Sequence, residues 1–310
     1  MNTIDVIIKF YGLLTNSTRL LSPLRYSVRK FADCLIPRLL SKERLSESNS
    51  LRTDVVDERK IIISFTSFPA RIERLWIIVR CMKRQSVKPD KIVLWLSKEQ
   101  FEDIPLPLSL TSLIDEQFEV RFVENDYRSH KKYCYAFKEY KDDIVILIDD
   151  DLYYQSTMVE GLLNGLKNHP DAVICQYGSV MSYNKDGSLP PFTVWWKEKA
   201  NASDSKDFFL GTGGGSLFQP NKLTSIILDT ELAFKLTPLA DDIWVNAMIR
   251  LSGLYIHKVK CGLLLQMPEQ QKTALKNQNS YDGKNDEQFK AVIDYFVKEN
   301  NINPFERREK

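Results

Sequence analysis

Three consecutive aspartates, Asp149, Asp150 and Asp151, directly follow the apolar run 144–148. Such a run predicts a buried strand, and carboxylates this close raise one another's pKa unless a cation lies among them. Because successive residues of a strand point to opposite faces, we expect Asp149 and Asp151 on one side and Asp150 elsewhere. Two carboxylates at a strand end predict a site for a hard divalent cation with open positions for phosphate oxygens. The alternative is an ordinary loop of solvated acids.

A second acidic pair, Asp241 and Asp242, lies in the first turn of a predicted helix at 238–253. An acid at this position caps unpaired N–H groups, so a purely structural role is the alternative to a catalytic one. The glycine-rich segment Gly211–Gly215 precedes the pair and matches neither a P-loop nor a GxGxxG fingerprint. Its glycines either let the backbone approach a sugar closely or form a tight turn.

The remaining candidates are basic, aromatic or histidine side chains: Arg128, Lys131, Lys132, Trp195, Trp196 and His257. The basic group precedes the aspartate strand, where it would hold a diphosphate beside a metal or form a solvated helix face. The two tryptophans offer a flat apolar surface to a sugar ring, with core packing as the alternative. The histidine is a candidate third metal ligand, although no second histidine lies at ligand spacing. A buried, hydrogen-bonded histidine is its alternative.

The elements that must position these residues follow an α/β pattern from residue 60 onward. The order predicts strand 60–66, helix 70–86, strand 91–97, short helix 110–117, strand 118–125, helix 129–140 and strand 143–151. This alternation predicts a mainly parallel, doubly wound sheet, in which ligands bind beyond the carboxyl ends of the strands. The three aspartates stand at such an end.

The second half is more mixed. We expect strands within 171–183, 191–196 and 253–266, a glycine-rich turn at 208–220, a polar loop at 276–288 and a closing helix at 289–300.

The composition bounds the class of protein. The 310 residues carry a formal net charge of +2, which gives no argument for nucleic acid. The five cysteines form no CxxC pair, as expected in a reducing compartment. We see neither a signal peptide nor an uninterrupted apolar run of about 18 residues. A cytoplasmic protein is therefore predicted.

The first fifty residues form a separate zone, amphipathic and locally basic, which a polar linker at 51–59 joins to the main domain at 60–310. This composition is typical of a helical extension that lies on an anionic membrane surface. Two helices packed on the main domain, or on a second copy of the chain in a homo-oligomer, are the other interpretation, and both stay open.

Taken together, four segments resemble bacterial glycosyltransferases of the GT-A fold, a Rossmann-like α/β fold. They are similar to the family-2-like enzymes that build capsule, lipopolysaccharide and other surface glycans. The segments are TSFPARI (66–72), YRSHKKYCYAFKEYKDDIVILIDDD (127–151), GTGGGSLFQP (211–220) and ADDIWVNAMIRLSG (240–253). The resemblance covers roughly 60–296 and leaves the first fifty residues outside.

The resemblance implies roles on the donor side. Asp149 and Asp151 match the ends of the DxD motif, with Asp151 on a Mn²⁺ or Mg²⁺ ion and Asp149 on the ribose or sugar as well as the metal. A third ligand would be His257 or Asp286, the latter in a segment (282–288) that resembles a loop closing over bound donor. Nucleotide binding falls to Thr66, Ser67, Phe68, Pro69, Arg71, Lys132, Asp149 and Asp150.

The resemblance also implies roles on the acceptor side. The sugar and acceptor pocket would be lined by Trp195, Trp196, Gly213, Gly214, Gly215 and Ser216. Asp242 or Asp241 would be the catalytic base of an inverting enzyme, and Asp242 is favoured. This chain has Asp where many relatives have Glu, so the choice between the two stays open.

The function predicted in this way is transfer of a sugar from a nucleoside-diphosphate donor, UDP-linked, to a hydroxyl of a glycan or lipid-linked glycan. Such an enzyme would act at the inner face of the cytoplasmic membrane. A carboxylate base must take the acceptor proton, and the metal neutralises charge on the leaving group. The alternatives are a nucleotidyltransferase, although no glycine-rich loop follows the first strand, and a non-catalytic glycan-binding or scaffold protein.

Overall fold

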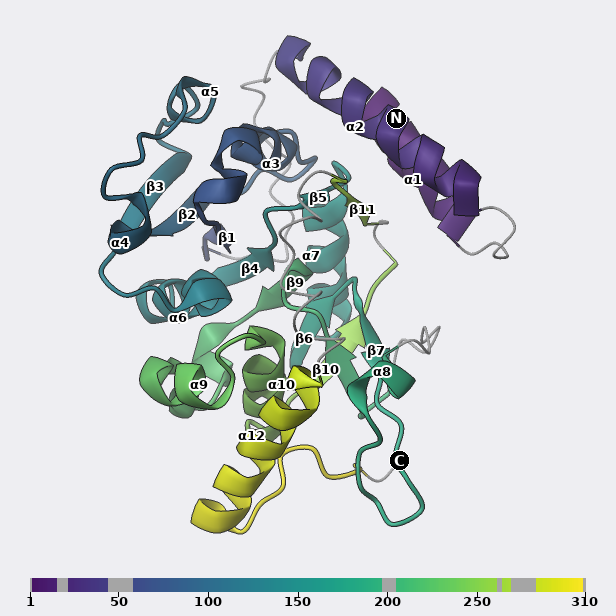
Figure 1. The fold of residues 1–310 in the computed structure, drawn as a ribbon, viewed down its shortest axis with the longest axis vertical. Helices are drawn as coiled ribbons and strands as arrows, with labels where there is room; N and C mark the ends of the chain where they lie inside the picture. The colour runs from purple at the N-terminus through teal and green to yellow at the C-terminus, as the bar shows by residue number, and fades with distance from the viewer. Residues whose placement is uncertain are drawn as a thin grey trace.

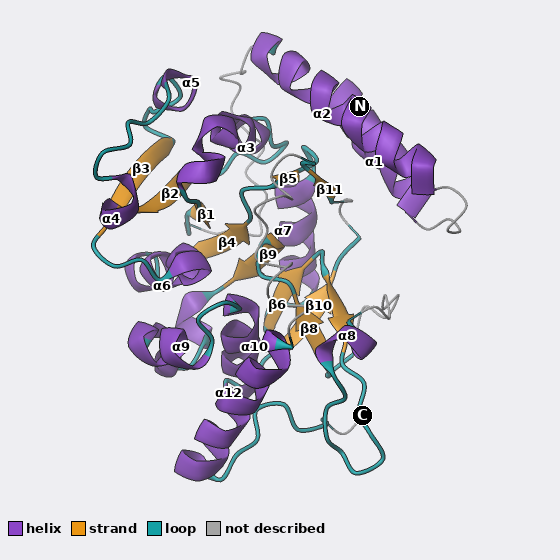
Figure 2. Ribbon diagram, viewed as in Figure 1, coloured by secondary structure: helices purple, strands orange, loops and turns teal. Residues whose placement is uncertain are grey.

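The protein is built around a mixed, mainly parallel seven-stranded sheet with helices on both faces (Figures 1 and 2). The computed structural model describes residues 2–15, 22–43, 58–196, 205–260, 264–268 and 283–308. The strand order is β10-β6-β9-β4-β1-β2-β3. These strands are β1 (Ile61–Thr66), β2 (Lys91–Ser97), β3 (Phe118–Val123), β4 (Ile144–Ile148), β6 (Ala172–Cys175), β9 (Gly214–Phe218) and β10 (Tyr255–Lys258).

The strand pairing explains the continuous apolar runs. β1 pairs in parallel with β2 and β4, β2 with β3, and β6 with β10, whereas β9 runs antiparallel to its neighbours β4 and β6. One sheet face packs on α3 (Leu75–Lys83) and α7 (Met158–Asn168). The other packs on α6 (Lys131–Glu139), α10 (Asp241–Leu251) and α12 (Lys284–Asn300). Since both faces are covered, the central strands β1, β2 and β4 are buried and mostly apolar on both sides, whereas the edge strands β3 and β10 carry charged and half-exposed side chains.

Shorter elements surround this frame. β5 (Leu152–Tyr153) pairs with β11 (Leu265–Gln266), and β7 (Gly178–Val180) pairs with β8 (Phe208–Leu210). The short helices are α4 (Lys98–Phe101), α5 (Leu108–Thr111), α8 (Phe192–Trp195) and α9 (Thr230–Leu236). The 3-10 turns are Pro69–Arg74, Arg128–His130, Pro220–Lys222 and Ser225–Leu228.

Three sequence predictions about the second half were wrong. Residues 191–196 contain α8, because Pro191 sets an extended N-cap and the aromatic side chains that favour a strand pack instead in a helical turn. The glycine-rich segment is not only a turn, since Gly214–Phe218 forms the central strand β9. In the described part of the predicted loop 276–288, Gly283 is the N-cap of α12 and the residues from Lys284 onward belong to that helix.

The N-terminal helices α1 (Thr3–Thr15) and α2 (Ser22–Lys42) pack against each other and on the main domain, α2 beside α3 and α1 beside β11. Asp5 of α1 is 5% exposed; it accepts hydrogen bonds from the amide and hydroxyl of Ser156 at 2.9 and 2.6 Å and pairs with buried Arg84 at 3.4 Å. No helix in the described ranges is long and apolar enough to cross a membrane. The predicted linker 51–59 lies outside the described residues up to 57.

Candidate active site

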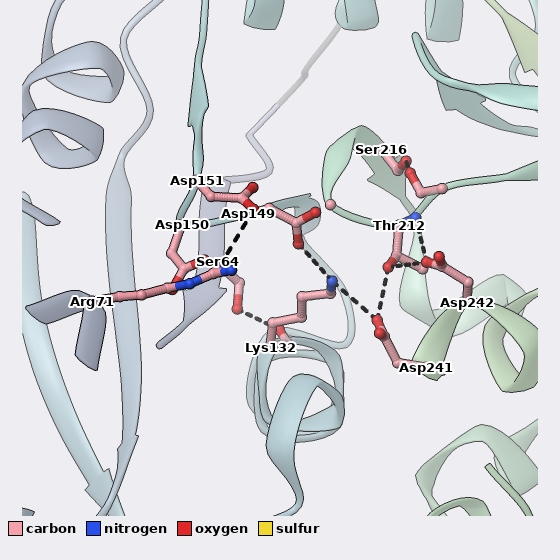
Figure 3. Close-up of polar contacts among 12 residues, drawn as sticks. Ser64, Arg71, Lys132, Asp149, Asp150, Asp151, Thr212, Ser216, Asp241 and Asp242 are labelled. Atoms are coloured by element: carbon pink, nitrogen blue, oxygen red, sulfur yellow. Dashed lines mark hydrogen bonds and ion pairs between the residues drawn. The ribbon is translucent and has the colours of Figure 1, made fainter. Parts of the chain in front are cut away.

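A single cavity of about 790 Å³ lies beyond the carboxyl ends of β1 and β4 and brings the two acidic clusters together. Asp149, Asp150 and Asp151 reach it directly after β4, and Asp241 and Asp242 reach it from the first turn of α10. Figure 3 shows the two clusters on either side of a lysine side chain. The cavity therefore places residues some ninety positions apart in sequence around one volume.

Asp150 is the structural member of the first cluster. It is 6% exposed, accepts a hydrogen bond from the Ser67 hydroxyl at 2.5 Å, and is bound by the Arg71 guanidinium. Burial raises its pKa, with Arg71 and Ser67 opposing the change. Both partners come from the segment after β1, so Asp150 anchors that segment to the end of β4.

Asp149 and Asp151 are the members available to a ligand. Burial and the charges of Asp150 and Asp149 raise the pKa of Asp151 to about 7. Its Oδ2 lies 3.4 Å from Arg71 Nη1. The Asp149 side chain is 42% exposed and pairs with Lys132 Nζ at 2.9 Å. Excess negative charge at Asp151 indicates a place that a cation would stabilise.

The segment after β8 ties both clusters together. The Asp149 amide donates to the Gly213 carbonyl at 2.9 Å, and the Tyr154 hydroxyl donates to the same carbonyl at 2.6 Å. A Cβ on Gly213 would lie 1.7 Å from Asp149 Oδ1, so any other residue there would displace the Asp149 carboxylate from its present position. One residue earlier, the Thr212 hydroxyl lies 2.7 Å from Asp241 Oδ2 and 2.5 Å from Asp242 Oδ1.

The two acids of α10 have opposite proton affinities. Burial opposes ionisation of Asp241, but Lys132, His130 and Thr212 outweigh it and lower its pKa. Burial and the Asp241 charge raise the pKa of Asp242 to about 7. A half-buried carboxylate that lines the cavity and takes up a proton near neutral pH meets the requirement for a general base.

Lys132 lies between the clusters (Figure 3). Its Nζ is 2.9 Å from Asp149 Oδ1 and 3.1 Å from Asp241 Oδ2. Burial works against its charged form, but the carboxylates of Asp149, Asp241 and Asp242 outweigh burial and raise the pKa. Its backbone carbonyl accepts a hydrogen bond from Ser64 of β1, which fixes the start of α6 against the sheet.

The cavity brings together most of the residues predicted from the sequence: Thr66, Ser67, Phe68, Arg71, Arg128, Lys131, Lys132, Asp149, Asp150, Asp151, Trp196, Gly213, Gly214, Asp241 and Asp242. Pro69, Trp195, Gly215 and Ser216 do not line it. Trp195 is 1% exposed and packs among aromatic rings of the core, and the Ser216 hydroxyl donates to the Gly211 carbonyl at 3.1 Å. Pro69 begins the 3-10 turn that carries Arg71.

Neither predicted third metal ligand reaches the aspartates. His257 lies on β10 at the sheet edge and stacks on His169 at 3.6 Å between ring centroids. Asp286 accepts a hydrogen bond from the Phe192 amide at 2.7 Å, which fixes α12 to α8. The described part of segment 282–288 is the N-cap and first turns of a helix, and Asp282 lies outside the described residues.

Sequence reasoning missed several residues that line the cavity, among them Tyr11, Gln100, Asp126, Tyr177 and Asn285. It also missed Thr212, which lies behind the cavity wall and binds Asp241 and Asp242. Thr212 could have been noticed from the sequence, because its hydroxyl lies between two glycines in the GTGGGS segment. Tyr11 and Asn285 carried none, because only the packing of α1 and α12 brings them to the site.

The donor set fits a hard divalent cation. Among the described residues, no group of three or more His, Cys, Asp or Glu side chains is arranged around one ion. The fit rests on Asp149 and Asp151 alone, which offer oxygen ligands only and leave positions for water and phosphate. Five carboxyl groups lie around Arg71 and Lys132, and burial together with the neighbouring carboxylates raises the pKa of Asp151 and of Asp242 to about 7.

No protein-family model and no curated protein matches the chain. Three similar solved structures are a mycobacterial protein, the glucosyl-3-phosphoglycerate synthase of Mycobacterium tuberculosis with Mn²⁺, UDP and glucosyl-3-phosphoglycerate, and the mannosyltransferase PcManGT of Pyrobaculum calidifontis with GDP-Man and Mn²⁺. Their identities are 13%, 13% and 11%, and their TM-scores 0.42, 0.44 and 0.39.

The alignments cover 67%, 75% and 82% of this chain and 67%, 83% and 66% of the respective structures.

Proposed function

We propose that this chain is a metal-dependent glycosyltransferase of the GT-A fold. It moves a hexose, with inversion, from a UDP-linked donor to a hydroxyl of a glycan or lipid-linked glycan. The reaction belongs to bacterial surface polysaccharide synthesis. One observation supports the proposal most strongly. Two acidic clusters face one cavity across Lys132, and one acid in each has a pKa near 7. Inversion needs the leaving group and the base on opposite sides of the sugar.

The donor would occupy the side of the cavity next to β1 and β4. Asp149 and Asp151 would hold Mn²⁺ or Mg²⁺, which supplies neutralisation of the charge on the departing diphosphate. The segment from Thr66 to Arg71 would bind the base and ribose, because Asp150 fixes it in place. Lys132 would add a positive charge beside the diphosphate.

Asp242 would act as the base. Its Oδ1 accepts both the amide and the hydroxyl of Thr212, at 2.8 and 2.5 Å, while its Oδ2 makes no hydrogen bond with the described residues. Oδ2 is thus the atom that can take a proton from an acceptor hydroxyl. Asp241 stays ionised beside Lys132 and raises the proton affinity of its neighbour.

The test is stabilisation by ligands. We expect UDP with Mn²⁺ to raise the melting temperature of the protein, EDTA to abolish the rise, and NTPs to give less. Asp151→Asn should lose the effect, Asp242→Asn should keep it and lose transfer, and the exposed Asp186→Asn should change neither. Absence of metal-dependent stabilisation by any nucleoside diphosphate contradicts the proposal. Stronger stabilisation by NTPs supports the nucleotidyltransferase alternative.

We also propose that the outer face of α1 and α2 lies on the anionic inner surface of the cytoplasmic membrane. The described residues of this extension carry three acids, and all three are engaged: Asp5 with Arg84, Asp33 with Arg74, and Glu43 with Arg84. The outward surface instead carries exposed apolar and basic side chains: Phe10, Leu13, Tyr26, Phe31, Lys9, Lys30, Arg38 and Lys42. Basic charge with exposed aromatics suits a lipid interface.

A further inference from the structure

One wall of the cavity has a chemistry different from the rest. It is formed by aromatic and apolar side chains next to the base: Tyr177, Phe192, Trp196, Phe209 and Leu239. The Trp196 ring stacks on Phe192 at 5.2 Å and meets Tyr177 edge-on at 5.6 Å. The Tyr177 pKa is raised by burial and by the Asp242 charge, which places this ring in the field of the base.

Asn285, in the first turn of α12, is the polar residue of this wall. It is 7% exposed, lines the cavity, and its Oδ1 is buried with no hydrogen-bond partner among the described residues. An unpaired buried polar atom costs about 1–3 kcal/mol, so such atoms are rare in native proteins and call for an explanation.

The side-chain hydrogen bonds that hold the first turn of α12 in place come from the neighbours of Asn285. Asp286 accepts from the Phe192 amide, and Gln288 accepts from the Leu239 amide at 2.9 Å and donates to the Lys284 carbonyl. These bonds fix α12 against α8 and the start of α10, which Figure 1 shows beside α12. The side-chain amide of Asn285 takes no part in these contacts. Rotation about its terminal torsion can present either the oxygen or the nitrogen to the cavity.

The charges of the cavity select between classes of ligand for this wall. The described cations that line it come from the segment after β1 and from the start of α6 and the turn before it: Arg71, Arg128, Lys131 and Lys132. The aromatic wall adds none among the described residues, and it lies next to Asp242. A phosphorylated or carboxylated group would therefore meet negative charge there, while an uncharged ring would pack its C–H face on the aromatics and hydrogen-bond the amide.

We infer that Asn285 and the aromatic wall around Trp196 form the acceptor subsite and that it takes an uncharged sugar ring, with the Asn285 amide binding a hydroxyl next to the reacting one. This inference rests on the proposed glycosyl transfer, because it makes the reacting hydroxyl the one that reaches Asp242. Asn285 is a specificity residue in this scheme, since it touches the acceptor and takes no part in proton transfer.

The test measures sugar binding directly, by saturation-transfer NMR on the full chain with UDP and Mg²⁺. The probes are a panel of methyl glycosides and the matching sugar phosphates. We expect methyl glycosides to bind and sugar phosphates to bind at least tenfold more weakly. Asn285→Leu should weaken methyl glycoside binding at least tenfold and leave UDP affinity within twofold. Glu287→Ala, exposed in the same turn, should change neither.

Stability separates this role from a structural one. Because Oδ1 has no partner among the described residues, Asn285→Leu should keep or raise the melting temperature. A lower melting temperature, unchanged glycoside binding, or preferential binding of sugar phosphates overturns the inference. These outcomes are distinct from failure of the proposed function, which would appear in the wild-type protein as absence of metal-dependent UDP binding.

Discussion

Thr212 donates both its backbone amide and its hydroxyl to one oxygen of Asp242, Oδ1, at 2.8 and 2.5 Å. The same hydroxyl lies 2.7 Å from Asp241 Oδ2, so its single proton is shared between two acids. Hydrogen bonds to the charged form of an acid lower its pKa. Thr212 therefore sets how readily Asp242 gives up and takes a proton, although it touches no reacting atom.

Replacing Thr212 by Val should slow transfer and shift its pH dependence. Losing a hydrogen bond to a charged group costs about 1.5–3 kcal/mol, which corresponds to a rise of about one to two units in the pKa of Asp242. Below the new pKa the ionised fraction of the base, and with it the rate of transfer, should fall roughly tenfold to hundredfold. The acidic limb of the pH–rate profile should move to higher pH, because Asp242 would hold its proton more tightly. Thr212→Ser keeps the hydroxyl and should retain both the wild-type rate of transfer and the wild-type position of the acidic limb. An unchanged acidic limb in the Val variant contradicts this role.

Asp242→Asn should become more stabilising as the pH rises. The folded pKa of about 7 lies above the ordinary Asp value of roughly 3.9, so between these values the folded state binds more protons than the unfolded chain. The contribution of Asp242 to the free energy of unfolding thus falls from about pH 4 to pH 7. Thermal melts at pH 5 and pH 8, without donor or metal, should show a larger gain over wild type at pH 8.

The control for this measurement is Asp186→Asn, at an exposed carboxyl whose pKa is lowered by hydrogen bonds to Ser188. Because its pKa is lowered from the ordinary Asp value, this variant should show no difference between the two conditions. A gain for Asp242→Asn that is the same at pH 5 and pH 8 contradicts the assignment.

Gly213→Ala should remove metal-dependent UDP binding with little loss of stability. The new Cβ would overlap the Asp149 carboxylate, which is partly exposed and can turn away toward solvent. UDP affinity in Mn²⁺ should fall at least tenfold. In an Asp149→Ala background the extra methyl has room, so the second substitution should add nothing to the loss. Additive losses in this double-mutant cycle contradict a direct contact between the two residues.

Asp5→Ala should destabilise the whole chain by about 2–4 kcal/mol, because it leaves buried Arg84 without its carboxylate partner on α1. Urea denaturation measures the change. Leu13→Ala on the same helix is the control; at 73% exposed it should change stability by about 0.5 kcal/mol or less. Equal stabilities of the two variants would mean that the extension is not part of the folded unit.

Replacing Phe10 and Phe31 together by Ser should reduce flotation with vesicles of phosphatidylglycerol and phosphatidylethanolamine. These rings are 50% and 62% exposed on the outer face of α1 and α2. Leu108→Ser on α5, 80% exposed, should leave flotation unchanged. Vesicle binding unaffected by the double substitution contradicts the membrane proposal. A change of oligomeric state in its place would favour contact with a second copy of the chain.

Local patterns were sufficient to predict the pieces of the site but not how they meet. The run ending at Asp149 and the helix start at Asp241 follow from apolar periodicity and charge, which neighbouring residues encode. Their meeting depends on β9, whose pairing with β4 and β6 is non-local and whose glycines resemble a turn. Asn285 could not be predicted from the sequence. Its proposed role depends on the packing of α12, in which Asp286 and Gln288 make the hydrogen bonds to neighbouring segments and Asn285 Oδ1 makes none with the described residues.

The position of β9 also has a consequence for how the chain reaches its native state. Four strands, β3-β2-β1-β4, leave the ribosome early and can pair in parallel, but β4 keeps one open edge until Gly214–Phe218 has been synthesised. The hydrogen bond from the Asp149 amide to the Gly213 carbonyl can also form only after this late segment has been synthesised. The donor half is therefore not a separable module: a chain truncated before β9 would expose an unpaired, aggregation-prone edge and would lack a finished aspartate cluster.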